Sequence, residues 1–130
     1  MAALRLFPGI SAEVVANILK PPLQGLVLEC YGVGNAPERD RDLLAALGEA
    51  SGRGVVIVDV TQCLRGRVDL GGYAAGSALA AVGVISGHDM TAEAALAKLL
   101  YLFGCGLAPE AVKHEMQRDL RGELTPPAPA

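Results

Sequence analysis

The sequence predicts an α/β fold: a three-layer α-β-α sandwich with a small, about four-stranded parallel sheet (Rossmann-like). Short apolar runs alternate with segments whose apolar residues recur at helical spacing, which is typical of parallel sheets with right-handed crossovers. The run Val55–Val60 is rich in β-branched residues, as in strands buried on both faces. Aromatic residues make up only 4% of the chain, so the core must be aliphatic.

The length of 130 residues fits one domain. We assign residues 1–124 to this domain and residues 125–130 to a tail. The tail reads Thr-Pro-Pro-Ala-Pro-Ala, a composition that predicts disorder.

The first half of the chain predicts two strands that are each followed by a helix. Ser11 can cap the first helix, which would bury Val14 on its apolar stripe. Pro37 would open the second helix, and Gly52 would end it in a left-handed conformation. The elements are expected at residues 4–7 (strand), 12–19 (helix), 26–30 (strand) and 37–50 (helix).

The second half predicts two further strands and three helices. Small residues at helical spacing, such as Ala74, Ala75 and Ala78, predict a tightly packed helix or a subunit contact. Thr91 can cap the next helix, and Pro109 can open the last one. The elements are expected at residues 55–60 (strand), 72–83 (helix), 83–87 (strand), 92–103 (helix) and 109–120 (helix).

Composition argues against several classes of protein. The net charge is −3 without a Lys/Arg cluster, so we do not expect a nucleic acid partner. The three cysteines, Cys30, Cys63 and Cys105, are odd in number and widely spaced, which argues against a disulfide framework or a zinc site. They favour a reducing, cytoplasmic location. His88 and His114 have no neighbours at metal-ligand spacing, so no metal is expected.

We expect neither a secretory leader nor a membrane partner. No charged and then apolar leader is visible, and the longest mostly apolar stretch, residues 71–85, is too short and too rich in glycine to span a bilayer.

The stretch Tyr31–Pro37 follows a predicted strand and carries two glycines and an asparagine. Gly32 and Gly34 permit a sharp turn and a close approach, and Asn35 offers an amide at its mouth. Ligands of α/β proteins bind beyond the carboxyl ends of strands, where residues 61–63 should also lie. An ordinary tight connection between strand and helix remains an equal alternative. Glu29, near the end of the same strand, either reaches water or faces a crevice.

Catalytic motifs are harder to find than a binding edge. The serines lack the motif of a nucleophile elbow, and no Walker loop exists. Gly32 and Gly34 lack the third glycine of a dinucleotide fingerprint. Thr61 has only Asp59 nearby in sequence to activate it.

Seven motifs nevertheless come in the order seen in one family. The sequence resembles the C-terminal domain of cytoplasmic, type I L-asparaginases, of the asparaginase/glutaminase family, from about Leu4 to Pro126. It also looks like the same domain of longer animal enzymes, in which ankyrin repeats follow. The motifs lie at residues 31–37 (YGVGNAP), 54–58 (GVVIV), 61–63 (TQC), 71–73 (GGY), 83–87 (GVISG), 89–91 (DMT) and 119–126 (DLRGELTP).

The resemblance implies hydrolysis of L-asparagine to L-aspartate and ammonia by a threonine nucleophile, without a metal or other cofactor. The family's catalytic residues lie in a larger N-terminal domain that is absent from this chain. The C-terminal domain would complete the neighbouring subunit's active site in a homodimer or tetramer. That role falls on Asn35, with Gly34 beside it. Alanine at Ala74 and Ala75 leaves the family's acidic substrate-amine contact unassigned.

The same resemblance implies an effector pocket that contains Thr61 and Cys63. Glu29 stands where asparagine-regulated relatives have arginine, and a carboxylate cannot hold an α-carboxylate, so we do not expect regulation by asparagine.

We therefore expect a module for dimerisation and active-site completion that is inactive alone. The alternative is a standalone α/β domain that binds a small ligand or another protein.

Overall fold

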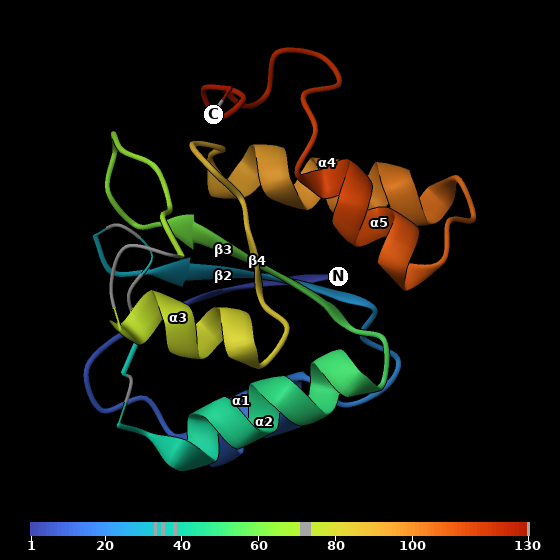
Figure 1. Cartoon of the computed structure of the whole chain (residues 1–130). Coiled ribbons are helices and arrows are strands. Elements are labelled where there is room, and N and C mark those ends of the chain that lie inside the picture. The colour runs from blue at the N-terminus through green and yellow to red at the C-terminus, as the bar shows by residue number, and fades with distance from the viewer. Residues whose placement is uncertain (33, 35, 38, 71–73, 130) are drawn as a thin grey trace.

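The structure is a computed structural model that describes residues 1–32, 34, 36–37, 39–70 and 74–129, with residues 74–77 described by their backbone alone. A central sheet separates two layers of helices (Figure 1). The strands are β1 (Ala2–Arg5), β2 (Gly25–Cys30), β3 (Val56–Thr61) and β4 (Ile85–Ser86). The helices are α1 (Ala12–Ile18), α2 (Arg41–Gly52), α3 (Ala74–Ala81), α4 (Ala92–Gly104) and α5 (Pro109–Met116).

The strands are all parallel and follow one another in the order β1-β2-β3-β4. When each strand is added on the same side, right-handed crossovers place the intervening helices on one face. In Figure 1, α1, α2 and α3 accordingly lie below the sheet, and α4 and α5 lie above it. The predicted three-layer sandwich with a four-stranded parallel sheet is confirmed.

Each face of the sheet has its own aliphatic core. Successive side chains of a strand point to opposite faces, so β2 and β3 supply both cores. The lower core contains Leu28, Ile57 and Leu47, and the upper core contains Val27, Val58 and Leu99. These side chains are fully buried.

The first strand lies two residues earlier than expected. Its register pairs Ala2 with Leu26 and Arg5 with Glu29, so the strand ends at Arg5. Phe7, expected within the strand, is 55% exposed at the start of the turn. In α1, Ser11 caps the helix as predicted, but Val14 is 53% exposed and not on the buried stripe.

The second helix begins at Arg41, four residues after the predicted start. Asp40 accepts a hydrogen bond from the Leu43 N–H at 2.9 Å and is the true cap. Gly52 belongs to the helix, and the left-handed residue is Gly54, with a φ of 99°. The prediction of Gly52 as the stop was therefore wrong.

Two elements of the second half are shorter than predicted. The fourth strand contains only Ile85–Ser86, and α5 ends at Met116 instead of near residue 120. The Lys98 ammonium donates to the carbonyl oxygen of Met116, the last residue of the helix, and to that of Arg118 beyond it, which fits a helix that does not continue. Of the predicted helix over residues 72–83, positions 72 and 73 lie outside the described residues.

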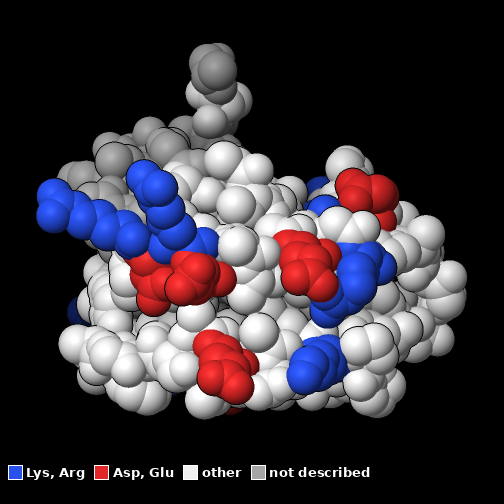
Figure 2. Space-filling view, turned by 90° about the horizontal axis from the view of Figure 1, so that it is seen from below, with Lys and Arg blue, Asp and Glu red and all other residues white. Residues whose placement is uncertain are grey.

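The face seen from below carries charges of both signs side by side (Figure 2). One neighbouring pair is Arg53 and Glu49, whose Nη1 and Oε1 atoms lie 3.0 Å apart. Within the described ranges, no helix is both long enough and apolar enough to cross a membrane.

Candidate functional site

The ends of β2 and β3 lie together at one edge of the sheet, as the sequence predicted. The Thr61 hydroxyl donates a hydrogen bond to the Gly32 carbonyl oxygen at 2.5 Å. The Gln62 N–H donates to the Cys30 carbonyl oxygen at 2.9 Å. We call this region, formed by residues 29–34 and 61–63, the carboxyl edge; Val33 within it lies outside the described residues.

We call the stretch Tyr31–Pro37 the glycine loop. It contains a tight turn in which the Gly34 N–H donates to the Tyr31 carbonyl oxygen at 2.9 Å. Gly34 has a φ of 102°, and a Cβ atom there would lie 2.7 Å from the Asp59 Oδ2 atom. Glycine is thus required both by the backbone and by its neighbour. Asn35, the predicted substrate-binding residue, lies outside the described residues.

Glu29 is mostly buried and forms an ion pair. Its Oε1 atom pairs with the Arg5 guanidinium at 3.0 Å, and its side chain is 17% exposed. The Gln62 side-chain amide donates to the backbone carbonyl oxygens of Leu6 and Glu29 at 2.6 and 2.9 Å. Gln62 therefore ties the end of β2 to the turn that follows β1.

Thr61 and Cys63 are also neighbours at the carboxyl edge. The Cys63 N–H donates to the Thr61 hydroxyl oxygen at 3.1 Å, and Cys63 is exposed. The structure therefore makes the predicted Thr61 and Cys63 direct neighbours, and Gln62 between them is bonded to the backbone of Glu29.

Three hydroxyl groups of the described residues, two of them at the carboxyl ends of strands, have structural partners. Thr61 donates to the Gly32 carbonyl oxygen, and Ser86 donates to the Val68 carbonyl oxygen at 3.2 Å. The Ser51 hydroxyl similarly lies 3.5 Å from the Gly83 carbonyl oxygen. A hydroxyl that donates to a carbonyl has no base to take its proton, so these groups are not arranged as nucleophiles.

Sequence reasoning gave little weight to Asp59, which the structure makes the most unusual residue of this edge. Its side chain is fully buried, and among the described residues neither carboxyl oxygen has an N–H or O–H partner, which leaves only the weak donor thiol of Cys30. Burial raises the pKa of Asp59 to about 8, although the nearby Cys30 thiol partly opposes the shift. The one available signal was an acid inside a β-branched run.

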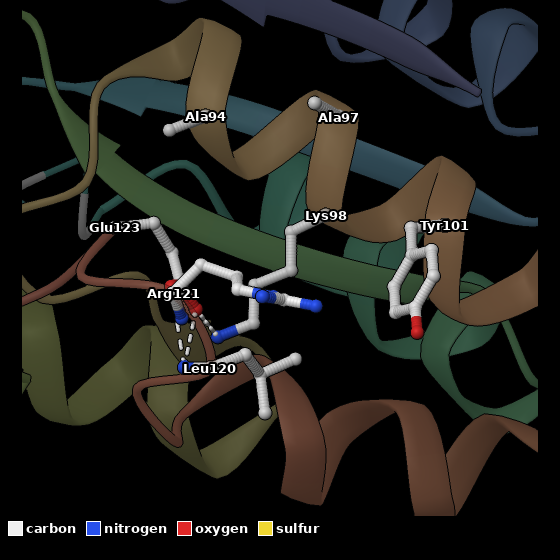
Figure 3. A pocket seen from close by; sticks show the side chains of 7 residues that line it. All are labelled: Ala94, Ala97, Lys98, Tyr101, Leu120, Arg121 and Glu123. Atoms are coloured by element: carbon white, nitrogen blue, oxygen red, sulfur yellow. Dashed lines mark hydrogen bonds and ion pairs between the residues drawn. The ribbon is translucent and has the colours of Figure 1, made fainter.

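A hollow lies on the face of the sheet that α4 and α5 cover, between α4 and the C-terminal segment (Figure 3). Its volume is about 630 Å³. Lys98 lies at its base, and its Nζ atom is 2.5 Å from the Glu123 Oε1 atom. Glu123 also accepts hydrogen bonds from the N–H groups of Leu120 and Arg121.

The charges of Lys98 and Glu123 in this hollow are therefore satisfied internally. The Lys98 ammonium has three acceptors, namely Glu123 and the carbonyl oxygens of Met116 and Arg118. A lysine that is satisfied in this way fixes the chain, and it does not offer a free cation to a ligand.

The histidines do not form a metal site in the part of the chain that the structure describes. No group of three His, Cys, Asp or Glu side chains there could hold a metal ion. His88 has a φ of 55° and lies in the turn after β4. Burial and the nearby Arg67 lower the pKa of His88.

Comparison with known proteins gives consistent matches. Residues 1–116 match the family model of the glutaminase/asparaginase C-terminal domain. The chain is 52% identical to "L-asparaginase 1" of Escherichia coli over 97% of its own length but only 37% of that protein. It is 54% identical to the human "60 kDa lysophospholipase", of which it spans 22%.

Solved structures agree with these matches. The crystal structure of L-asparaginase I from Vibrio cholerae matches with a TM-score of 0.91 at 55% identity, over 95% of this chain and 37% of that one. The chain thus spans well under half the length of the relatives it matches.

Proposed function

Because the chain belongs to the glutaminase/asparaginase C-terminal domain family, we propose that it acts as the C-terminal module of an amidohydrolase that converts L-asparagine to L-aspartate and ammonia. The module promotes dimerisation and completes the active site, and it has no turnover alone. We place this enzyme in the cytoplasm.

One observation carries this proposal. The chain aligns over 97% of its length with an asparaginase but covers only 37% of that enzyme. The hydroxyl groups of Ser51, Thr61 and Ser86 are directed to backbone carbonyls, which fits a module whose nucleophile lies in the missing part.

The glycine loop is the part of the module that we assign to the neighbouring subunit's substrate site. Asn35 would donate its side-chain amide to the substrate, and Gly34 would let the loop approach closely. The position of the loop beyond the end of β2 supports this role, because ligands of α/β sheets bind beyond the carboxyl ends of strands.

The exposed apolar side chains support an incomplete assembly. Leu64 is 104% exposed in the loop after β3, next to the carboxyl edge. We assign it to the contact with the catalytic N-terminal domain or with a second subunit in a homodimer or tetramer.

We retain Glu29, Thr61 and Cys63 as a candidate effector pocket. Its occupant would have to tolerate the Glu29 carboxylate, which Arg5 already neutralises at 3.0 Å. Glu29 itself offers no positive charge to hold a ligand α-carboxylate, so we assign no regulation by asparagine to this pocket.

The relatives' names include both an asparaginase and a lysophospholipase. A module shared by both does not by itself set the substrate. Asparagine is our choice because the matched solved structure is an asparaginase at 55% identity.

Our first prediction concerns assembly and Asn35. The purified chain should release no ammonia from asparagine above buffer. Co-expression with the part of Escherichia coli L-asparaginase 1 that lies outside its match should give a complex that does. Asn35→Ala should lower this activity by roughly tenfold to a hundredfold, as expected when a hydrogen bond to a charged substrate is lost.

Asn17→Ala is the matched control, because the Asn17 side chain accepts from Lys20 on the surface of α1, away from the carboxyl edge. This variant should keep the activity of the complex. Ammonia release by the chain alone would contradict the proposal and favour a standalone enzyme. A complex that forms and is active but is unaffected by Asn35→Ala would refute the role of that residue.

A further inference from the structure

Asp59 combines complete burial with the absence of any N–H or O–H partner for its carboxyl oxygens among the described residues; the weak donor thiol of Cys30 is its one hydrogen-bonding neighbour there. Buried carboxyl groups nearly always have such partners, because an unpaired buried polar group is costly. In the sheet register Asp59 lies between Leu28 of β2 and Ser86 of β4, so three strands hold its backbone. Its side chain, by contrast, extends beyond this framework to residues outside the sheet.

Gly34 lies against the carboxyl group, and the Val68 side chain lies on the same side of Gly34. A Cβ atom on Gly34 would lie 2.7 Å from both the Asp59 Oδ2 atom and the Val68 Cγ1 atom. Counting only partners in the described part of the chain, Gly34 has one backbone hydrogen bond, to Tyr31 within its own turn. Val68 is fixed more firmly, because its N–H donates to the His88 carbonyl oxygen at 2.8 Å and its carbonyl oxygen accepts from Ser86. Of the two residues, Gly34 is therefore the easier to displace.

The surroundings of Asp59 contain no described cation that could neutralise it. From β2 it meets the Cys30 thiol, whose own pKa is raised by burial and by Asp59. The segment before Gly34 carries Tyr31, and the residues flanking Val68 are the exposed Arg67 and Asp69.

On the β4 side, the Ser86 hydroxyl donates to the Val68 carbonyl oxygen and accepts from the His88 N–H. Burial, Arg67 and Lys98 lower the pKa of His88, and Asp89 raises it. The pKa of Asp59 is raised to about 8, first by burial, and only Cys30 lowers it. The acid therefore remains largely protonated at neutral pH.

We propose that Asp59 is a positioning residue of the glycine loop: as a neutral acid it lets Gly34 pack against the end of β3, and as a carboxylate it displaces Gly34 to reach water. The consequence for catalysis rests on the proposed function, which assigns Gly34 to a substrate site. The movement itself is a property of this chain and can be measured without activity.

The direction of the pH dependence follows from linkage. A carboxyl group with a raised pKa in the packed state favours packing most at low pH. This preference is lost as pH rises from the ordinary pKa of about 4 to the packed-state value of about 8. Displacement of Gly34 should thus increase over this range and level off above it.

Cys30 provides a direct reporter, because it is buried beside Asp59 whereas Cys63 and Cys105 are exposed. Both exposed cysteines are replaced by serine. The rate at which 4,4′-dithiodipyridine modifies Cys30 is then measured between about pH 5.5 and 7.5. The rate for the urea-unfolded chain at the same pH is divided by this native rate. This ratio, the protection of Cys30, should fall by at least about tenfold across the range.

Asp59→Asn removes the titrating group while keeping its shape, so the protection of Cys30 should then be independent of pH. The labelling rate of Cys30 is also measured at low urea concentrations, which separates local from global opening. Only global unfolding exposes enough surface to make this rate depend steeply on urea. An equal pH dependence in both proteins would overturn the proposal. A labelling rate that rises steeply with urea would overturn it as well.

Gly34→Ala provides a second variant that does not change Asp59. The added Cβ atom cannot fit against Oδ2 and Val68, so protection of Cys30 should already be low at pH 5.5. Unchanged protection in this variant would contradict the proposal. Failure of the ammonia assay above would leave these labelling results unaffected, so the two proposals fail separately.

Discussion

Gly34 and Gly83 illustrate how a single residue can be fixed by its backbone and by its neighbours together. Gly83 ends the connection from α3 to β4 with a φ of 95°, a conformation that side chains rarely adopt. A Cβ atom there would lie 2.2 Å from the Ser51 Oγ atom and 3.1 Å from the Ser51 Cβ atom. The glycine thereby lets this connection pack against the end of α2.

At this scale we predict that Gly83→Ala destabilises the chain by about 2 kcal/mol, the sum of backbone strain and displacement of Ser51. The free energy of unfolding from urea titration measures the effect. Gly104→Ala is the control: it lies in the last turn of α4 with open space around it, so it should be neutral or slightly stabilising. Equal effects of the two substitutions would contradict this account.

At the scale of elements, the Lys98–Glu123 ion pair joins α4 to the segment after α5. The side chains are 4% and 16% exposed, so solvent screens the pair weakly. Burial alone would raise the pKa of Glu123, but the hydrogen bonds from Lys98, Arg121 and Leu120 lower it to about 2. The pair thereby fixes the segment around Glu123, which forms neither a helix nor a strand.

This pair predicts a specific acid sensitivity. Because the folded-state pKa of Glu123 lies below its ordinary value of 4.5, its contribution is complete above about pH 4.5 and is lost as pH falls toward 2. Glu123→Gln should therefore destabilise the chain by about 2 kcal/mol at pH 7. The difference between the two proteins should disappear near pH 2.

Urea unfolding at several pH values measures this difference. Glu110→Gln is the matched control, because the Glu110 side chain is 85% exposed in its pair with Lys113. A surface pair contributes little, so this variant should unfold like the parent at every pH. A pH-independent effect of Glu123→Gln would refute the assigned role of its charge.

At the scale of the whole molecule, the fold is complete while the proposed site is not. The four-stranded sheet is covered on both faces, and each face has its own core. The relatives it matches are about three to five times longer, since the chain spans 37% and 22% of two of them. The module can therefore be stable while its ligand affinity depends on the rest of the enzyme.

We predict that isothermal titration calorimetry of the chain alone gives only weak heats with asparagine, aspartate and nucleotides. A site shared between subunits supplies only part of its contacts from one module, and each lost hydrogen bond lowers affinity. The co-expressed complex should bind aspartate, the product, more tightly than the chain does. Tight binding by the chain alone would instead favour the standalone ligand-binding domain.

Most of the fold could be predicted from the sequence, because local patterns determine it. Ser11 and Thr91 cap their helices as expected, since a capping hydroxyl acts within three residues. The start of α2 was missed because Pro37 and Asp40 are both good helix-opening residues, and their competition is decided by packing. The end of α5 was missed as well, and Lys98, which donates to the carbonyl oxygen of its last residue, is 18 residues away in sequence.

The features of the candidate site also fall into those that the sequence predicted and those that it did not. The meeting of the glycine loop with residues 61–63 followed from the rule for parallel strands, and the Thr61–Gly32 hydrogen bond confirms it. The pairing of Glu29 with Arg5 and the isolation of Asp59 did not follow from any local pattern.

The sequence by itself determined the family resemblance, the alternation of strands and helices and the edge at which the candidate residues meet. These depend on periodicity, capping and the direction of parallel strands, which act over short distances. Only the tertiary structure decided which charges are paired and which are buried alone. Desolvation and ion pairing depend on every neighbour in space, and the neighbours of Asp59, Glu29 and Lys98 come from distant parts of the chain.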